Sequence, residues 1–269
     1  MEVIRDVMTP APPAPVTPAA PLIVPPPSLA SWEMYFKFYG PDVPLPVAMA
    51  WTKEESGGIP CAIGDLPPPG ATQPREYGLA QLNVGDPSNV KIGTAQALRP
   101  MCAFGTTQEE WKAATHPTTP AARALMAQAR KRWESLTRPM TEGEKIEHVV
   151  AAIELMRHCA KIATKYLGGD QLVNQGGGGV WNAADFWRLA KCYHFSSAVC
   201  NEFPQVQAAL GRLPTWLEFK DGANDISLAY TRVGSNGKEY HPYSQSWLDG
   251  GWRNVDVVGD AMLSKDPNI

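Results

Sequence analysis

The chain has 269 residues, of which 44% are hydrophobic and 19% charged, with a formal net charge of -3. This length and composition allow a sizeable core within one large domain. The small negative charge and a pI near 6.0 argue against a broad nucleic-acid-binding face, which needs clustered lysine and arginine. No stretch of the sequence approaches the roughly 18 uninterrupted apolar residues of a membrane span. Nucleic acid and membrane are therefore not expected partners.

Residues 1–28 are expected to form a proline-rich arm. The segment TPAPPAPVTPAAPLIVPPP favours polyproline II, because proline fixes φ and lacks a backbone donor. Its Leu-Ile-Val stretch, residues 22–24, offers an apolar surface to a partner protein. The first 15 residues carry charges where the apolar core of a signal peptide would begin. We therefore expect cytoplasmic synthesis without a signal peptide.

Hydrophobic periodicity predicts one mainly helical domain over residues 29–269. Aromatic residues at helical spacing indicate a first helix over residues 29–39. A second helix is expected from Val47 to Glu55, because the stretch begins after a proline and ends at two glycines. Its last turn holds Glu54 and Glu55, where the negative end of the helix dipole favours a protonated carboxyl group.

Further elements follow along the chain. Helices are predicted over residues 119–136, 141–169 and 182–194, and a last helix near the C-terminus. Thr141 and Glu144 form a capping-box pattern at the start of the longest helix. The run QGGGG at residues 175–179 lacks the features of a phosphate-binding loop and is expected to be a flexible turn. Ser235-Asn236-Gly237 indicates a short β-hairpin.

The cysteines and histidines show no metal-binding pattern. The five cysteines are scattered, odd in number and lack a Cys-x-x-Cys pair, which favours buried free thiols. The histidines have no partner at ligand spacing. We therefore expect neither a metal site nor a cofactor.

Four short motifs occur in a familiar order. They are E55-S56 at a helix end, G78-L79-A80-Q81 after a loop, K165-Y166-L167 at the end of the long helix, and C192-Y193-H194 in the next helix. In this order they resemble the soluble lytic transglycosylase family and its goose-type lysozyme relatives. The resemblance covers residues 47–194, and its first two motifs are the more specific. Ala80 replaces the usual methionine, the loop before it is longer, and Cys192 and His194 replace a small residue and an amide.

The resemblance implies a mainly α, lysozyme-like α+β fold with a substrate cleft and a small β-hairpin. The motif core would span residues 47–194, followed by a C-terminal extension over residues 195–269. The implied activity is cleavage of the MurNAc-GlcNAc β-1,4 bond of peptidoglycan glycan strands with formation of 1,6-anhydro-MurNAc ends. Such cleavage needs a carboxyl group that still carries its proton near neutral pH.

Glu55 is the implied proton donor, because it is the glutamate that precedes serine in the family motif. Ser56 would orient its carboxyl group, and Gly78, Leu79, Gln81 and Tyr193 would form the substrate-binding set. Weaker candidates are Glu54 as the acid, Trp51 as an apolar wall one turn before Glu55, and Tyr230 as a rival of Tyr193.

Two alternatives remain open at this point. A muramidase would need a second carboxylate, for which Asp65, Glu76 and Asp86 are unranked candidates. A non-enzymatic virion structural protein could keep the same scaffold. A wall-degrading enzyme without a signal peptide suggests a bacteriophage virion component that acts on the host wall or periplasm during genome entry. In that case the proline-rich arm would bind other virion proteins.

Overall fold

The computed structural model describes residues 27–64, 66, 69–70, 76–83, 102, 105–168 and 181–264. The expected arm up to residue 26 and the glycine run at 175–179 lie outside these residues. So do Asp65 and Asp86, two of the three candidate second carboxylates.

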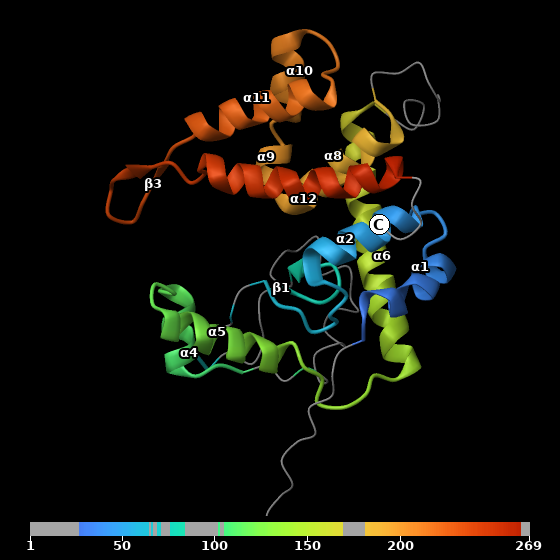
Figure 1. Cartoon of the computed structure of the whole chain (residues 1–269). Coiled ribbons are helices and arrows are strands. Elements are labelled where there is room, and N and C mark those ends of the chain that lie inside the picture. The colour runs from blue at the N-terminus through green and yellow to red at the C-terminus, as the bar shows by residue number, and fades with distance from the viewer. Residues whose placement is uncertain are drawn as a thin grey trace, which may run out of the picture.

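The described part of the chain is mainly helical, as expected (Figure 1). The helices are η1 (Leu29–Trp32), α1 (Glu33–Tyr39), α2 (Leu45–Ser56), α4 (Gln108–Thr115), α5 (Pro120–Trp133), α6 (Glu142–Tyr166), α8 (Ala183–Phe195), α9 (Ser197–Cys200), α10 (Phe203–Leu210), α11 (Trp216–Ala229) and α12 (Gln245–Leu263). Two antiparallel hairpins pair β1 (Glu76–Tyr77) with β2 (Leu82–Asn83) and β3 (Arg232–Val233) with β4 (Glu239–Tyr240). None of the helices in these ranges is long and apolar enough to cross a membrane.

Local signals account for the helix boundaries. The capping box of Thr141 and Glu144 is present at the start of α6, as predicted. α2 ends at Gly57, whose φ of 62° is the left-handed conformation that glycine adopts without strain. The predicted first helix is instead a 3-10 turn followed by α1. α4 and α11 were not predicted, although Thr107 and Thr215 each begin a capping box.

The core lies around α8. This helix packs against α6 on one side and α12 on another, and α12 also contacts α2. α6, α8 and α12 are therefore the frame on which the end of α2 is held (Figure 1). Fully buried aromatic residues, including Trp51 and Trp252, fill the space between these helices.

α4 and α5 form a separate pair that projects to the same side as the β3–β4 hairpin (Figure 1). Arg130 at the end of α5 fastens this pair to the segment after α2. Its guanidinium donates to the carbonyl oxygens of Ile63 (2.9 Å) and Gly64 (3.0 Å). The α4–α5 pair is thus tied to residues just beyond the predicted catalytic turn.

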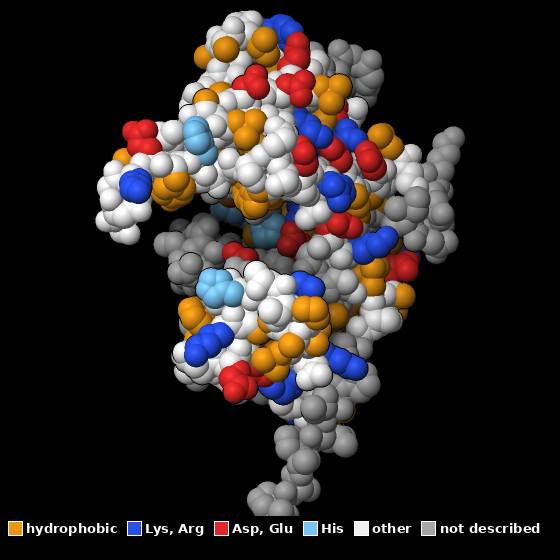
Figure 2. All heavy atoms as spheres, turned by 60° about the vertical axis from the view of Figure 1, so that its left-hand side comes forward, with side chains coloured by type: hydrophobic (Ala, Val, Ile, Leu, Met, Phe, Trp, Pro, Cys, Tyr) orange, Lys and Arg blue, Asp and Glu red, His pale blue; other side chains and the backbone are white. Residues whose placement is uncertain are grey.

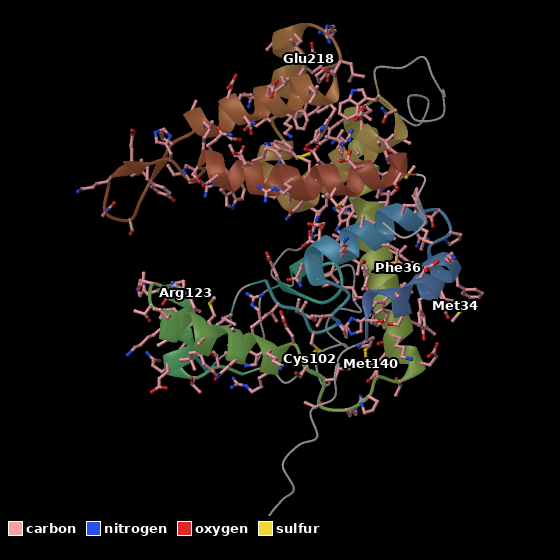
Figure 3. All side chains as sticks on the ribbon, in the orientation of Figure 1. Met34, Phe36, Cys102, Arg123, Met140 and Glu218 are labelled. Carbon is pink, nitrogen blue, oxygen red and sulfur yellow. A yellow bond between two sulfur atoms is a disulfide. The ribbon has the colours of Figure 1, made fainter. Side chains whose placement is uncertain are left out.

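A disulfide corrects the expectation that all five cysteines are free thiols. Cys61 and Cys102 are bonded, with a Cα–Cα distance of 5.7 Å and a sequence separation of 41. The pair packs with Leu136 and Met140 between the α4–α5 pair and α6 (Figure 3). Spacing alone did not reveal the bond, because the two cysteines are 41 positions apart in the sequence. Cys159, Cys192 and Cys200 are buried and free, as expected.

We expect the disulfide to stabilise the fold by about 2–4 kcal/mol, because it closes a long loop in the unfolded chain. The replacement of both Cys61 and Cys102 by alanine should lower the free energy of urea unfolding by that amount. Addition of a reductant should lower the free energy of unfolding of the wild type by the same amount. It should not change the free energy of unfolding of the double variant. An unchanged midpoint for the reduced wild type would show that the bond contributes nothing.

Candidate functional site

The last turn of α2 meets the β1–β2 turn, so the two more specific motifs lie side by side. The Ser56 hydroxyl contacts the carbonyl oxygens of Thr52 and Leu79, both at 2.9 Å, and accepts from the Gly58 amide at 3.1 Å. Leu79 belongs to the loop that joins β1 to β2. Ser56 is 92% shielded from solvent. It therefore fastens the helix end to the Gly78–Gln81 turn, with its hydroxyl used by backbone groups and not by the Glu55 carboxyl.

The Gly78–Gln81 turn is held in an uncommon backbone conformation. Gly78 has a φ of 90° and Gln81 a φ of 50°, the one positive φ of a non-glycine residue among the described ones. The Gln81 side-chain nitrogen donates to the carbonyl oxygens of Ala62 (3.0 Å) and Gly78 (3.1 Å). Gln81 thus stabilises the turn from within, while Leu79 and Ala80 are buried beneath it.

Glu55 meets two basic side chains from α8. Its Oε1 is in direct contact with Lys191 Nζ and lies 3.4 Å from His194 Nε2. The Glu55 side chain is 18% exposed, whereas that of Lys191 is 1% exposed. The carboxylate therefore lies at the edge of the interior, with the ammonium behind it.

Trp51 forms the apolar wall of this cluster. Its ring is fully buried, one turn before Glu55. The Lys191 ammonium lies 4.8 Å from the Trp51 ring centroid, and the His194 ring lies 5.6 Å from it. Both basic groups are therefore held against an aromatic surface in a poorly hydrated place.

Burial governs the protonation of the basic groups. It lowers the pKa of Lys191 to about 7, opposed in part by the negative charge of nearby Glu54. Burial, together with the positive charge of Lys191, lowers the pKa of His194 to about 3. The charge of Glu76 and a hydrogen bond to the Ala80 backbone oppose this shift. His194 is therefore neutral at physiological pH, whereas burial disfavours the Lys191 ammonium and the Glu55 carboxylate in contact with it favours that ammonium.

The molecular surface is hollowed beside the α4–α5 pair. Figure 2 shows the hollow between the α4–α5 pair and the C-terminal helices, with histidine and acidic side chains visible on its floor. Glu76 of β1 shares this region, since it acts on His194 and lies close to Gly64 and Gln81. Of the candidate second carboxylates, Glu76 is thus the one that the described residues bring toward Glu55.

The two predicted tyrosines lie in different places. The Tyr193 ring packs edge to face against His158 of α6, with 6.1 Å between the centroids. Tyr230 follows α11 at the base of the β3–β4 hairpin and is 46% exposed. It is His194, the neighbour of Tyr193, that contacts the Glu55 carboxylate.

Sequence reasoning missed Lys191. The residue follows Trp187 by four positions and precedes His194 by three, so the three share one face of α8. A lysine between two aromatic side chains on a helix face was the available signal, because a buried lysine requires an acidic partner.

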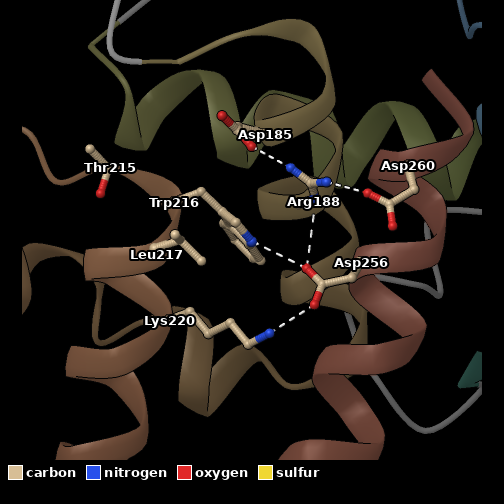
Figure 4. A pocket seen from close by; sticks show the side chains of 8 residues that line it. All are labelled: Asp185, Arg188, Thr215, Trp216, Leu217, Lys220, Asp256 and Asp260. Atoms are coloured by element: carbon tan, nitrogen blue, oxygen red, sulfur yellow. Dashed lines mark hydrogen bonds and ion pairs between the residues drawn. The ribbon is translucent and has the colours of Figure 1, made fainter. Parts of the chain in front are cut away.

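A polar pocket of about 580 Å³ between α8, α11 and α12 has paired charges (Figure 4). Arg188 is bonded to Asp185 at 2.5 Å and to Asp260, and lies 3.6 Å from Asp256. Lys220 binds Asp256 at 2.7 Å. The ion pairs in this pocket join three helices, so we assign it a structural role.

Comparisons with protein-family models, with curated proteins and with solved structures gave no match. The resemblance to lytic transglycosylases therefore depends on the motifs and their geometry.

His148 lies under the Gly78–Gln81 turn and should make the fold sensitive to acid. It is 2% exposed, and burial lowers its pKa to about 3. Because an unfolded histidine titrates near 6.5, the unfolded chain binds more protons than the folded chain between about pH 6.5 and pH 3. Stability should therefore fall as the pH drops below about 6.5.

From pH 7 to pH 5 this histidine should cost about 2 kcal/mol of unfolding free energy. The His148→Met variant should lose about 2 kcal/mol less than the wild type over the same interval, as measured by urea unfolding. A packing defect of the variant would appear equally at both pH values. An identical pH dependence for both proteins would show that His148 is not the titrating group.

Proposed function

We propose that this protein is a peptidoglycan lytic transglycosylase that cleaves the MurNAc-GlcNAc β-1,4 bond with Glu55 as its single catalytic carboxyl group. One observation carries the proposal. The Glu55-Ser56 and Gly78–Gln81 motifs, 23 residues apart at their bonded positions, are joined by the hydrogen bond from Ser56 to Leu79. This hydrogen bond supports the proposal, because it brings the end of α2, where Glu55 lies, beside the Gly78–Gln81 turn.

The reaction can be written with Glu55 alone. The protonated carboxyl group donates its proton to the glycosidic oxygen, and the bond from C1 of MurNAc to that oxygen breaks. The resulting carboxylate accepts the proton of the C6 hydroxyl group as O6 attacks C1. The product is a 1,6-anhydro ring, the glutamate regains its proton, and no water is consumed.

The Lys191 ammonium has opposite effects on the two halves of the reaction. An adjacent ammonium favours the ionised carboxylate, which suits the second half of the reaction but disfavours the first. Because burial lowers the pKa of Lys191 to about 7, its neutral amine is accessible near neutrality. We propose that the reactive state has a protonated Glu55 beside a neutral Lys191, and that the ammonium form stabilises the carboxylate between the two halves.

The alternatives each have one observation in their favour. A muramidase with Glu76 as the second carboxylate is supported by the electrostatic effect of Glu76 on His194, which contacts Glu55. The ion pair between Lys191 and Glu55 supports a non-enzymatic protein on the same scaffold, because a carboxylate bound to an ammonium is not free to donate a proton.

The location of action is proposed from the disulfide. Such bonds persist in oxidising places such as the periplasm, and the Cys61–Cys102 bond fits an enzyme that acts on the host wall or periplasm. Carriage in a bacteriophage virion to aid genome entry, with the arm bound to other virion proteins, stays a prediction.

Mass spectrometry of digested peptidoglycan tests the proposal. We expect anhydro-MurNAc ends from the wild type and a loss of at least about 10³-fold in turnover for Glu55→Gln, because the amide cannot donate the proton. The matched control Glu54→Gln should remain active. Reducing ends would instead support the muramidase, and no product from the wild type would support the non-enzymatic protein.

The pH profile tests the part assigned to Lys191. In the proposed reactive state Glu55 and Lys191 hold one proton between them, and the pair loses it only as the lysine titrates, whereas in Lys191→Met the carboxyl group holds the proton alone. The descending limb of the profile of kcat/KM should therefore move downward by about 1–3 pH units, toward the ordinary range of a carboxyl group. Circular dichroism should establish that the variant is folded, and an unshifted limb in a folded variant would contradict the assignment.

A further inference from the structure

Four aromatic side chains form a line that begins one residue from the candidate site. Phe195 follows His194 at the end of α8, and its ring centroid lies 4.8 Å from that of Trp247 in the first turn of α12. Trp247 lies 5.2 Å from Tyr243, and Tyr243 lies 6.4 Å from Tyr230. Successive planes are inclined by only 33° to 36°. We call these four residues the aromatic track.

The aromatic track is partly open to solvent. Trp247 is 43% and Tyr230 46% exposed, whereas Tyr243 and Phe195 are half-buried. Large aromatic residues gain most from complete burial. Neighbouring rings that contact each other at a tilt and still keep exposed faces therefore indicate a binding surface.

The surrounding structure holds the track in place. Gly251 of α12 leaves room for the inner ring, since a Cβ atom there would lie 1.7 Å from Phe195 Cζ. At the outer end, the Arg232 guanidinium lies 5.6 Å from the Tyr230 ring centroid, and His241 Nδ1 is 3.2 Å from the Tyr230 carbonyl oxygen. Both ends are thus fixed by specific contacts.

The track is continuous with the candidate site. Its inner end adjoins His194, which lies 3.4 Å from the Glu55 carboxylate. Figure 2 shows hydrophobic side chains on the underside of the C-terminal helices, next to the histidine and acidic groups in the hollow. A polymer bound at Glu55 can therefore continue along these rings.

We infer that the aromatic track binds a glycan strand outside the cleavage point, with sugar rings stacked on Trp247 and Tyr230. The C–H faces of pyranose rings carry a slight positive charge and pack on the negative faces of aromatic rings. The Tyr hydroxyls, Ser244 and Ser246 provide polar edges for the sugar hydroxyl groups. This inference rests on the proposed function for the identity of the polymer, and it assigns a binding task to residues 195–247, outside the motif core.

Binding to glycan strands freed of their stem peptides tests the inference. The experiment uses the full chain with Glu55→Gln, so that the strands stay intact, and isothermal titration calorimetry. The added substitutions Trp247→Ala and Tyr230→Ala should each weaken binding about tenfold. Trp247→Phe should restore most of the affinity, because it keeps a stacking ring. Phe38→Ala, which alters an aromatic residue of α1 that is 75% exposed, should have no effect.

Several outcomes would overturn the inference. One is an unchanged affinity for glycan strands in both folded alanine variants, and another is binding of the chain to stem peptides alone. A third is a sedimentation experiment in which the track only joins two copies of the chain. Tyr230→Ala keeps the test valid if Trp247→Ala does not fold. The proposed function fails separately: if the chain with Glu55 intact binds glycan strands through the track but releases no product, the track stands and the enzymatic proposal falls.

Discussion

The ion pair between Glu55 and Lys191 is the interaction on which the centre of the molecule depends. Lys191 is almost completely buried, and an ammonium in that position needs a carboxylate beside it. Removal of one partner from a buried pair typically costs about 3–5 kcal/mol. The pair also joins α2 to α8, so the residues that face the hollow and the helices that form the core share one contact. The site is thus built into the frame of the fold.

The second constraint is the fastening of the β1–β2 turn to the end of α2. A serine hydroxyl, a glutamine amide and a left-handed glycine together hold this turn over the helix end. All three were singled out from the sequence as substrate-binding candidates. The structure assigns Ser56 and Gln81 hydrogen bonds within the protein, so they act on Glu55 by positioning the backbone around it. Motif residues of this kind are recognised by their chemical type, although their role is often to hold the backbone in a particular geometry.

Much of the fold could be predicted, because the signals were local. The capping box of α6, the glycines after α2 and the Asn-Gly turn of the C-terminal hairpin each determine the conformation of a few neighbouring residues. The Cys61–Cys102 bond and the pairing of Glu55 with Lys191 could not be predicted in the same way. They join residues 41 and 136 positions apart. No periodicity in the sequence records which distant side chains meet, and the contact between His194 and the Glu55 carboxylate was missed for the same reason.

Gly251 illustrates how a missing side chain can determine the character of a surface. A glycine within a helix normally weakens it by roughly 0.5–1 kcal/mol relative to alanine. Here the empty volume above its Cα is occupied by the Phe195 ring, which lies closer than any methyl group would allow. The glycine that weakens α12 locally is therefore what allows the Phe195 ring to lie beside the Glu55 cluster. The position of an aromatic ring at the end of α8 is thus set from inside the protein, by a buried residue that has no side chain of its own.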